Sequence, residues 1–237
     1  HISLVMNFTR PTESTPALLT YDEVETFLHE FGHALHGLMA NSRYESLSGT
    51  NVYRDFVELP SQLMENWLPE QEFLETFAHH HLTGEVLPDS LIQKIRNTQR
   101  YHVGYHCVRQ LTFGMLDMAW HTQTEKIEDI TAFEQNAISP TQLLPVIDGT
   151  LISSQFSHVF GGGYAAGYYG YKWAEVLDAD AFSLFKEKGI FNREAASSFR
   201  ENVLSKGGTE HPMELYVRFR GHKPETRALI EKMGLGK

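Results

Sequence analysis

The sequence is poor in cysteine and in positive charge. Cys107 is the single cysteine among 237 residues, which excludes an internal disulfide framework and is compatible with a reducing compartment. Only 20 Lys and Arg residues stand against 30 Asp and Glu residues, and the net charge is −10. We therefore expect no nucleic-acid partner, because binding to a phosphate backbone requires a basic surface. We also expect no membrane partner, because no stretch approaches the roughly 20 consecutive apolar residues that cross a bilayer.

The remaining composition is that of an ordinary globular protein, with 41% hydrophobic and 21% charged residues. No signal-peptide pattern follows His1. Apolar side chains alternate along residues 2–8, which predicts a half-buried strand; they are Ile2, Leu4, Met6 and Phe8. A chain that starts in mid-strand is expected to be a piece of a larger protein, and any localisation signal would lie in the missing part.

Helical patterns dominate from residue 70 on, and an earlier helix is predicted after residue 20. Thr20 and Glu23 form a capping-box pattern, and the apolar residues that follow recur at helical spacing. A second helix is expected around residues 58–67. Further helices are predicted over residues 70–82, 89–120, 129–137, 163–187, 192–205, 212–219 and 224–233. The predicted fold class is therefore mostly α, with a short N-terminal β element.

Residues 29–33 read His-Glu-Phe-Gly-His within the first predicted helix. At helical spacing His29 and His33 lie one above the other, roughly opposite the apolar face, and can supply two nitrogen ligands to zinc. Glu30 would not be a ligand, since in metallopeptidases with this motif the glutamate takes a proton from the metal-bound water. The alternative is a surface helix in which the histidines have no metal.

A catalytic zinc site needs a third protein ligand, and Glu58 in "DFVELPSQ" is the candidate. The alternative is local, because Asp55 and Glu58 form a capping-box pattern of their own. A cap at Asp55 would place Pro60 inside the helix, where proline is unfavourable. Gln62 and Glu65 continue one polar face from Glu58, which suits a ligand and the groups that orient it.

The segment of residues 156–171, "FSHVFGGGYAAGYYGY", combines glycines with tyrosines. Three consecutive glycines at 161–163 permit a hinge. Tyr164, Tyr168 and Tyr171 follow at i, i+4 and i+7, which is one face of a helix. The spacing alone favours an aromatic stripe in the core. The alternative is a set of hydroxyl donors directed at a developing oxyanion.

Several long segments in a fixed order resemble one family. They are "HEFGHALHGL", "LSGTN", "RDFVELPSQLMENW", "FSHVFGGGYAAGYYGYKWAEVL" and "RENVLSKGGTEHPMELYVRFRG". Together they resemble the M3 family of zinc metallopeptidases, the group of thimet oligopeptidase, oligopeptidase A and peptidyl-dipeptidase Dcp, essentially from residue 1 to 237. The resemblance implies a zincin-like helical domain with one zinc ion on His29, His33 and Glu58, and with Glu30 as general base.

The resemblance also implies roles for the glycine-tyrosine segment. In the family, the histidine before the glycines and the tyrosines after them contact the substrate and help to stabilise the tetrahedral intermediate. This would make His158, Tyr168 and Tyr171 catalytic, and would make Gly162 and Tyr164 substrate-binding residues.

The same resemblance implies that residues 1–237 are the C-terminal catalytic domain of a larger protein. The missing N-terminal half would form one wall of a deep channel and would be a partner of this domain.

Short unstructured peptides are the expected substrates. "SGTNVYRDFVELPSQ" looks most like the peptidyl-dipeptidase branch, which implies release of C-terminal dipeptides. The alternatives are an oligopeptidase A-like endopeptidase and a non-catalytic zinc or peptide-binding fragment. The expected location is the cytoplasm, with the periplasm as the alternative.

Overall fold

The computed structural model describes residues 1–236 and confirms a mostly α fold. The chain forms two compact units, residues 101–173 and the residues on either side of them, and each unit is described by itself. Within the described residues there is no strand, and β pairing is limited to one bridge between His79 and Val86. No helix in this part of the chain combines the length and the apolar character needed to cross a bilayer.

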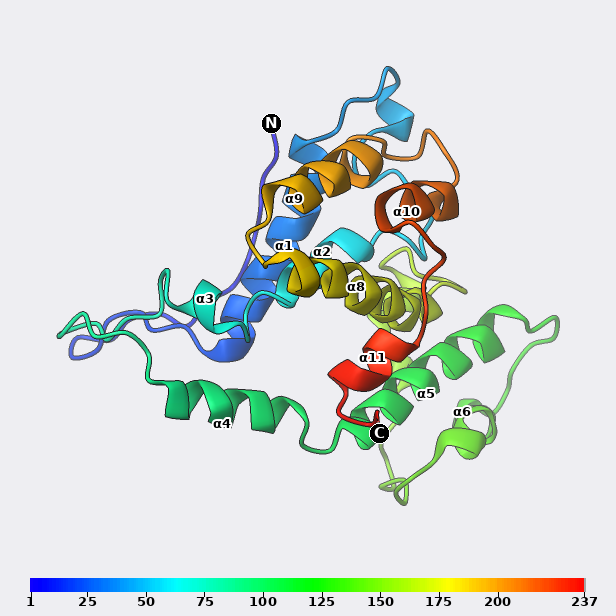
Figure 1. The fold of residues 1–237 in the computed structure, drawn as a ribbon. Helices are drawn as coiled ribbons and strands as arrows, with labels where there is room; N and C mark the ends of the chain where they lie inside the picture. Colours follow the sequence, from blue (N-terminus) through cyan, green and yellow to red (C-terminus); the bar gives the residue numbers. More distant parts are fainter. Residues whose placement is uncertain (237) are drawn as a thin grey trace. The chain divides into compact units, whose positions relative to one another are not determined.

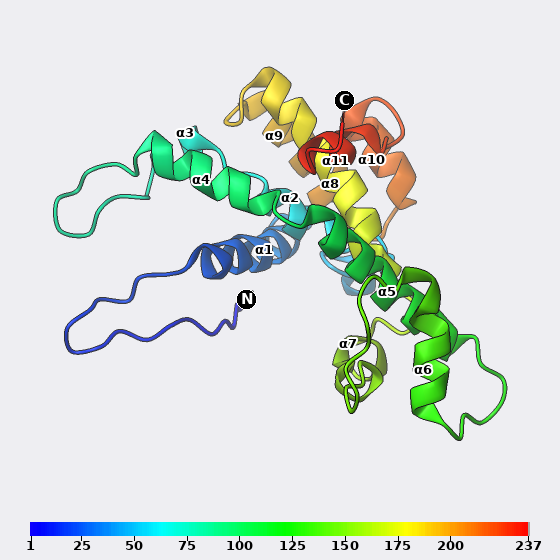
Figure 2. The same ribbon diagram turned by 90° about the horizontal axis from the view of Figure 1, so that it is seen from below.

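The structure does not show the short N-terminal β element predicted over residues 2–8, which have no strand assignment. This segment runs openly towards the first helix (Figure 2). Leu4 and Met6 of the predicted apolar face are half-buried, but Ile2 and Phe8 are 48% and 38% exposed, so the face is only partly buried. A strand needs a neighbouring strand to satisfy its main-chain groups, and the described residues offer none. The segment is tied to the first helix by Thr9, whose N–H and hydroxyl donate to Glu23 Oε1 at 2.6 and 2.7 Å.

The first unit contains most of the helices, and its elements are labelled in Figure 1. Before residue 101 they are α1 (Tyr21–Leu38), η1 (Glu45–Leu47), α2 (Leu59–Glu65), α3 (Gln71–Leu74) and α4 (Asp89–Gln99). After residue 173 they are the main part of α8 (Tyr169–Lys188), α9 (Arg193–Phe199), the π-helical turn η4 (Arg200–Leu204), α10 (Pro212–Arg220) and α11 (Arg227–Lys232).

The predicted start of α1 is confirmed. Thr20 Oγ1 accepts the N–H of Glu23 at 3.2 Å, and Glu23 Oε2 accepts the N–H of Thr20 at 2.8 Å. The hydrogen bond from the Thr20 N–H, followed by those from Thr9, lowers the pKa of Glu23 to about 2. The capping carboxylate is therefore ionised at neutral pH, which also suits the positive end of the helix dipole.

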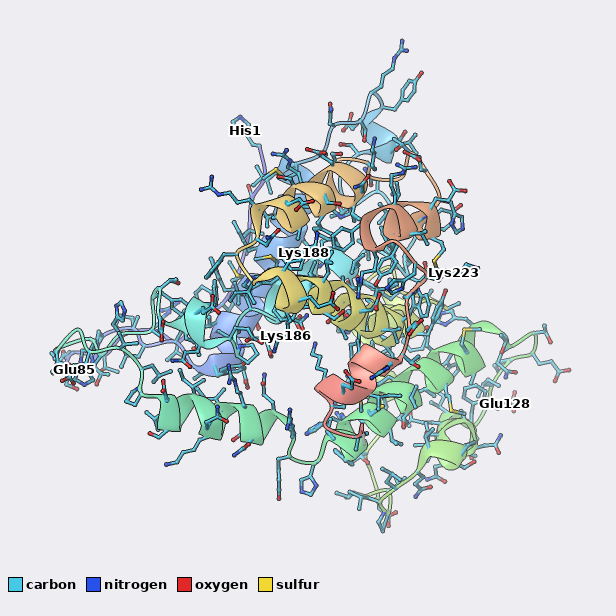
Figure 3. All side chains as sticks on the ribbon, viewed as in Figure 1. His1, Glu85, Glu128, Lys186, Lys188 and Lys223 are labelled. Atoms are coloured by element: carbon cyan, nitrogen blue, oxygen red, sulfur yellow. The ribbon has the colours of Figure 1, made fainter. Side chains whose placement is uncertain are left out.

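Two aromatic and aliphatic clusters hold the first unit together. Leu28 of α1 packs with residues of α3 and α4 in a buried group that comprises Leu28, Leu68, Leu74 and Ile92. Trp67, just after α2, meets Phe182 and Phe185 of α8 edge to face, with ring centroids 4.8 and 4.9 Å apart. At the C-terminal end of α8 (Figure 3), Lys186 Nζ donates to Glu70 Oε1 at 2.8 Å. These contacts fix the far end of α2 against α8.

The second unit consists of α5 (Val103–His121), α6 (Ile130–Ile138), η2 (Ser139–Thr141), η3 (Ser153–Gln155), α7 (Ser157–Phe160) and the first turn of α8. Its core is made of Leu116, Ile138, Phe156 and Val159. The single helix predicted over residues 89–120 is wrong, because the chain is interrupted between α4 and α5. His102 has a φ of +53° there, a left-handed conformation that ends a right-handed helix.

The helices α1 and α2 approach each other unusually closely at Gly32. A Cβ atom on Gly32 would lie 2.5 Å from both the carbonyl oxygen of Pro60 and the Cα atom of Ser61. Both views show the two helices side by side (Figures 1 and 2). Main-chain atoms cannot move aside as a side chain can, so only glycine fits here. At Gly37, further along α1, an added Cβ atom would instead lie 2.7 Å from Cδ1 at the end of the Ile2 side chain.

These two glycines provide a matched pair of substitutions. Gly32→Ala should destabilise the chain by roughly 1–3 kcal/mol, because overpacking against main chain outweighs the gain in helix propensity. Gly37→Ala should be neutral or stabilising by up to about 1 kcal/mol, since the flexible Ile2 side chain can move aside. Urea denaturation of both variants measures the difference. Equal stability of the two would contradict a main-chain clash at Gly32.

His36 lies in α1 and is fully buried, at 0% exposure. Neither of its ring nitrogens has a hydrogen-bond partner among the described residues. Burial, followed by the charge of His33, lowers the pKa of His36 to about 4. The ring is therefore neutral in the folded protein at pH 7, where it acts as a core side chain and not as a charged one.

The pKa of His36 predicts a pH dependence of stability. The unfolded chain binds a proton at this histidine near pH 6.5, whereas the folded chain binds it only near pH 4. Folding stability should therefore fall as the pH falls between these values, by up to roughly 3 kcal/mol. His36→Leu should remove this part of the loss, measured by denaturation of the metal-free protein at pH 7, 5.5 and 4.5. The control is His81→Leu at an exposed site, which should behave as wild type.

Candidate metal centre

The three predicted ligands come from two helices of the first unit. His29 and His33 stand one turn apart on α1, and Glu58 immediately precedes α2. The side chain of Glu58 makes no capping hydrogen bond to α2. The helix starts at Leu59, so Pro60 occupies the second position, where its missing N–H has no intrahelical acceptor to lose. The helix therefore does not begin at Asp55, as the capping alternative required, and the Glu58 carboxylate is turned towards α1.

The carboxylate of Glu58 meets both imidazoles with the same oxygen. Oε2 lies 3.2 Å from Nε2 of His29 and 3.2 Å from Nε2 of His33. The two rings are 5.0 Å apart at their centroids and nearly perpendicular, at 83°. Glu58 is only 2% exposed, whereas the histidine side chains are 21% and 23% exposed. The cluster thus has a buried carboxylate at its base and imidazoles that water can reach.

The geometry of this cluster fits a zinc ion. One ligand atom from each of the three residues lies within 4.8 Å of the others. Ligand atoms about 2.0–2.1 Å from a tetrahedral zinc ion lie about 3.3 Å from one another. The two distances of 3.2 Å from Oε2 match that spacing. Two imidazole nitrogens and one carboxylate are also the donor set of many catalytic zinc sites, in which water takes the fourth position.

A second layer of groups orients the candidate ligands. Glu65 Oε1 lies 2.6 Å from Nδ1 of His29, which directs Nε2 of the same ring at Glu58. Ser61 Oγ donates to Glu58 Oε2 at 2.9 Å, one turn further along α2. Nδ1 of His33 is buried and has no such partner among the described residues. The polar face predicted on α2 is confirmed for Glu65, while no sequence pattern pointed to Ser61.

The carboxylates also decide the charge of His29. Burial lowers the pKa of this imidazole, but its hydrogen bonds with Glu58 and Glu65 outweigh burial and raise the pKa to about 10. The cluster thus strongly favours a positive charge between the two carboxylates. A bound divalent cation would take the place of the proton on Nε2, because imidazole binds metals in its neutral form. Glu30 follows His29 on α1 and is half-buried.

The glycine-tyrosine segment belongs to the second unit. The predicted helix over residues 163–187 begins only at Tyr169, so Tyr164 and Tyr168 lie in the loop before α8 and do not share a helix face with Tyr171. The three tyrosine rings nevertheless lie close together. Tyr171 lies 5.0 Å from both Tyr164 and Tyr168, and His158 of α7 lies 6.1 Å from Tyr171.

We call the rings of His158, Tyr164, Tyr168 and Tyr171 the aromatic cluster. These four rings differ in their surroundings. Tyr168 also packs edge to face on Phe156 at 5.1 Å and on Phe113 at 5.7 Å, which is the core packing expected of an aromatic stripe. Gly162 lies against α7, where a Cβ would come within 3.0 Å of the Cα and oxygen atoms of His158. A larger residue at this position would therefore require the main chain of α7 to shift by a few tenths of an ångström.

Sequence reasoning missed one buried acid of the second unit. Asp117 of α5 is fully buried, yet no motif pointed to it. The one available signal is an acidic residue within the otherwise apolar run "FGMLDMAW". A carboxylate in such a run must find hydrogen-bond donors inside the protein.

Comparison with known proteins agrees with this geometry. The profile described as Peptidase family M3 matches residues 1–235. Oligopeptidase A of Escherichia coli (strain K12) is 45% identical over 238 residues, which cover 98% of this chain and 35% of the relative. Dipeptidyl carboxypeptidase of the same organism is 43% identical over 234 residues, covering 98% of this chain and 34% of the relative. The chain thus spans about a third of the length of these curated relatives. Because the family profile matches nearly the whole chain, the chain belongs to peptidase family M3.

Proposed function

We propose that this chain carries the catalytic zinc site of a peptidase that hydrolyses short peptides. The observation that carries the proposal is Glu58 Oε2, which lies 3.2 Å from the Nε2 atoms of both His29 and His33. The two helices thereby offer three ligand atoms to one ion, with Glu30 next to the first ligand. Membership of a peptidase family and peptidase relatives support peptide hydrolysis as the reaction.

In this mechanism His29, His33 and Glu58 would hold one zinc ion per chain. When bound, zinc polarises the scissile carbonyl and makes water more acidic. Glu30 accepts the proton of the attacking water and later delivers it to the leaving amine. Glu65 keeps the His29 ring in the required tautomer through its hydrogen bond to Nδ1. A non-catalytic zinc site is the weaker alternative, because such a site has four protein ligands and no use for a base beside them.

We assign the aromatic cluster of the second unit to substrate binding and to the oxyanion. Tyr171, Tyr168 and His158 would donate hydrogen bonds to the oxygen that becomes negative in the transition state. Tyr164 and Gly162 would contact the peptide. The gathering of three phenols around one imidazole supports this assignment. These roles require the longer protein, whose remaining part would supply the other wall of the substrate channel.

For the cleavage mode we propose release of C-terminal dipeptides. The support is the likeness of "SGTNVYRDFVELPSQ" to the peptidyl-dipeptidase branch. Overall identity does not separate the branches, since it is 43% to the dipeptidyl carboxypeptidase and 45% to the oligopeptidase A. Endopeptidase action of the oligopeptidase A kind is therefore the second candidate. The cytoplasmic location stays a prediction.

Two substitutions separate the metal from the base. Glu30→Gln should keep zinc but lower peptide turnover by roughly 10²–10⁴-fold, because it removes only the proton acceptor. Glu58→Ala should weaken zinc binding by more than about 100-fold, since losing a ligand costs more than losing an orienting group. Elemental analysis, chelator competition and peptide turnover of the full-length protein measure both effects. The control is Glu72→Gln on an exposed part of α3. Wild-type turnover in Glu30→Gln would refute the mechanism.

The cleavage mode can be tested with one peptide in two forms. A peptidyl-dipeptidase recognises the free C-terminal carboxylate, so the full-length protein should release dipeptides from the free peptide and leave the C-terminally amidated form largely intact. Mass spectrometry of the products over time distinguishes the modes. Internal cleavage of both forms at equal rates would favour the endopeptidase alternative.

A further inference from the structure

The second unit contains a carboxylate whose position bears on the aromatic cluster. Asp117 of α5 has 0% exposure. Its Oδ1 accepts the N–H of Ala166 at 2.9 Å, and its Oδ2 accepts the N–H of Tyr168 at 2.9 Å. Nδ1 of His121, one turn along α5, lies 2.8 Å from the same Oδ1. Both oxygens of this buried carboxylate are thus used, and both main-chain donors come from the loop between α7 and α8.

The two hydrogen bonds hold a conformation that the loop would not adopt unaided. Ala166 has a φ of +51°, in the left-handed region that is unfavourable for a residue with a Cβ atom. Tyr168 directly precedes α8, so Asp117 also places a negative charge at the first N–H groups of that helix. The carboxylate therefore determines both the turn of the loop and the point at which α8 begins.

The positions of the aromatic rings depend on the same two features, the turn at Ala166 and the residue at which α8 begins. Tyr164 lies before the turn at Ala166, and Tyr171 lies in the first turn of α8, yet their rings stack at a centroid distance of 5.0 Å. A different turn, or an earlier start of α8, would separate them. Tyr168, whose own N–H is held by Asp117, brings its ring to 5.0 Å from Tyr171.

We propose that Asp117 is a positioning residue for the peptidase reaction, acting through the loop of residues 161–168 and the tyrosines attached to it. Asp117 does not contact the peptide itself. The imidazole of His121 lies against the carboxylate, with Nδ1 2.8 Å from Oδ1 and hydrogen-bonded to the main-chain oxygen of Asp117 at 2.9 Å. The proposal rests on the proposed function, because it assumes that these tyrosines act on the substrate.

A matched control lies in the same unit. Glu134 of α6 is a second buried carboxylate, 4% exposed, that also accepts main-chain N–H groups. Its oxygens accept from the N–H of Ile152 at 2.8 Å and of Ser153 at 2.7 Å, outside the tyrosine loop. Substitution of either carboxylate removes comparable hydrogen bonds, so a general loss of stability would affect both variants alike.

The experiment compares Asp117→Asn with Glu134→Gln in the full-length protein. An asparagine keeps the shape but can no longer accept from both N–H groups. Amide hydrogen exchange within residues 161–168 should rise at least about 10-fold in Asp117→Asn and stay near wild type in Glu134→Gln. Turnover should fall by roughly 10–100-fold in Asp117→Asn alone, with unchanged zinc content, because the tyrosines are displaced from the transition state.

His121→Leu is the second variant, and it decides the question if Asp117→Asn does not fold. It leaves the carboxylate present but removes the imidazole that lies 2.8 Å from Oδ1, so exchange and turnover should change in the same direction by a smaller factor. Wild-type turnover in a folded Asp117→Asn, or equal losses in Asp117→Asn and Glu134→Gln, would overturn the proposal. A wild-type protein that hydrolyses no peptide would overturn the proposed function instead. Exchange, which needs no activity, distinguishes the two failures.

Discussion

The contact of α1 with the start of α2 at Gly32 is the constraint on which the candidate metal centre depends. Gly32 lies between His29 and His33 in the sequence, and the main chain of Pro60 and Ser61 rests on it without room for a Cβ atom. Glu58 lies two residues before Pro60, so the same approach brings its carboxylate to both imidazoles. A glycine inside a helix costs about 1 kcal/mol relative to alanine. That cost is offset by a packing that no larger residue permits.

Both units use buried carboxylates to hold neighbouring groups in place. In the first unit the buried Glu58 and the half-buried Glu65 enclose His29 and favour a positive charge between them, and Ser61 donates to Glu58. In the second unit Asp117 holds main-chain N–H groups and thereby the turn before α8. A buried carboxylate without donors is very unfavourable, so each of these acids can exist only where its partners are correctly placed. Each buried carboxylate therefore restricts the chain to an arrangement in which its hydrogen-bond donors are within reach.

The chain spans about a third of the length of its curated relatives, so it supplies only part of the proposed function. The candidate ligands and the candidate base lie within one unit of the chain. In the proposed function, peptide binding over a longer surface would come from a part of the protein outside this chain. Binding energy from such remote contacts can be used to position the scissile bond, which the ligands alone do not do.

Features that depend on near neighbours could be predicted from the sequence. The capping box at Thr20 and Glu23 and the alignment of His29 with His33 follow from helix geometry alone.

Other features needed the tertiary structure, because their partners lie far away along the chain. Local patterns left Glu58 open as a cap or a ligand, and only the packing of α2 on α1 turned it towards the histidines. The pattern of residues 2–8 is that of a strand, but a strand requires a neighbouring strand, and the described residues contain none. The helix predicted from residue 163 starts at Tyr169, because a carboxylate from α5 stabilises a left-handed turn just before it.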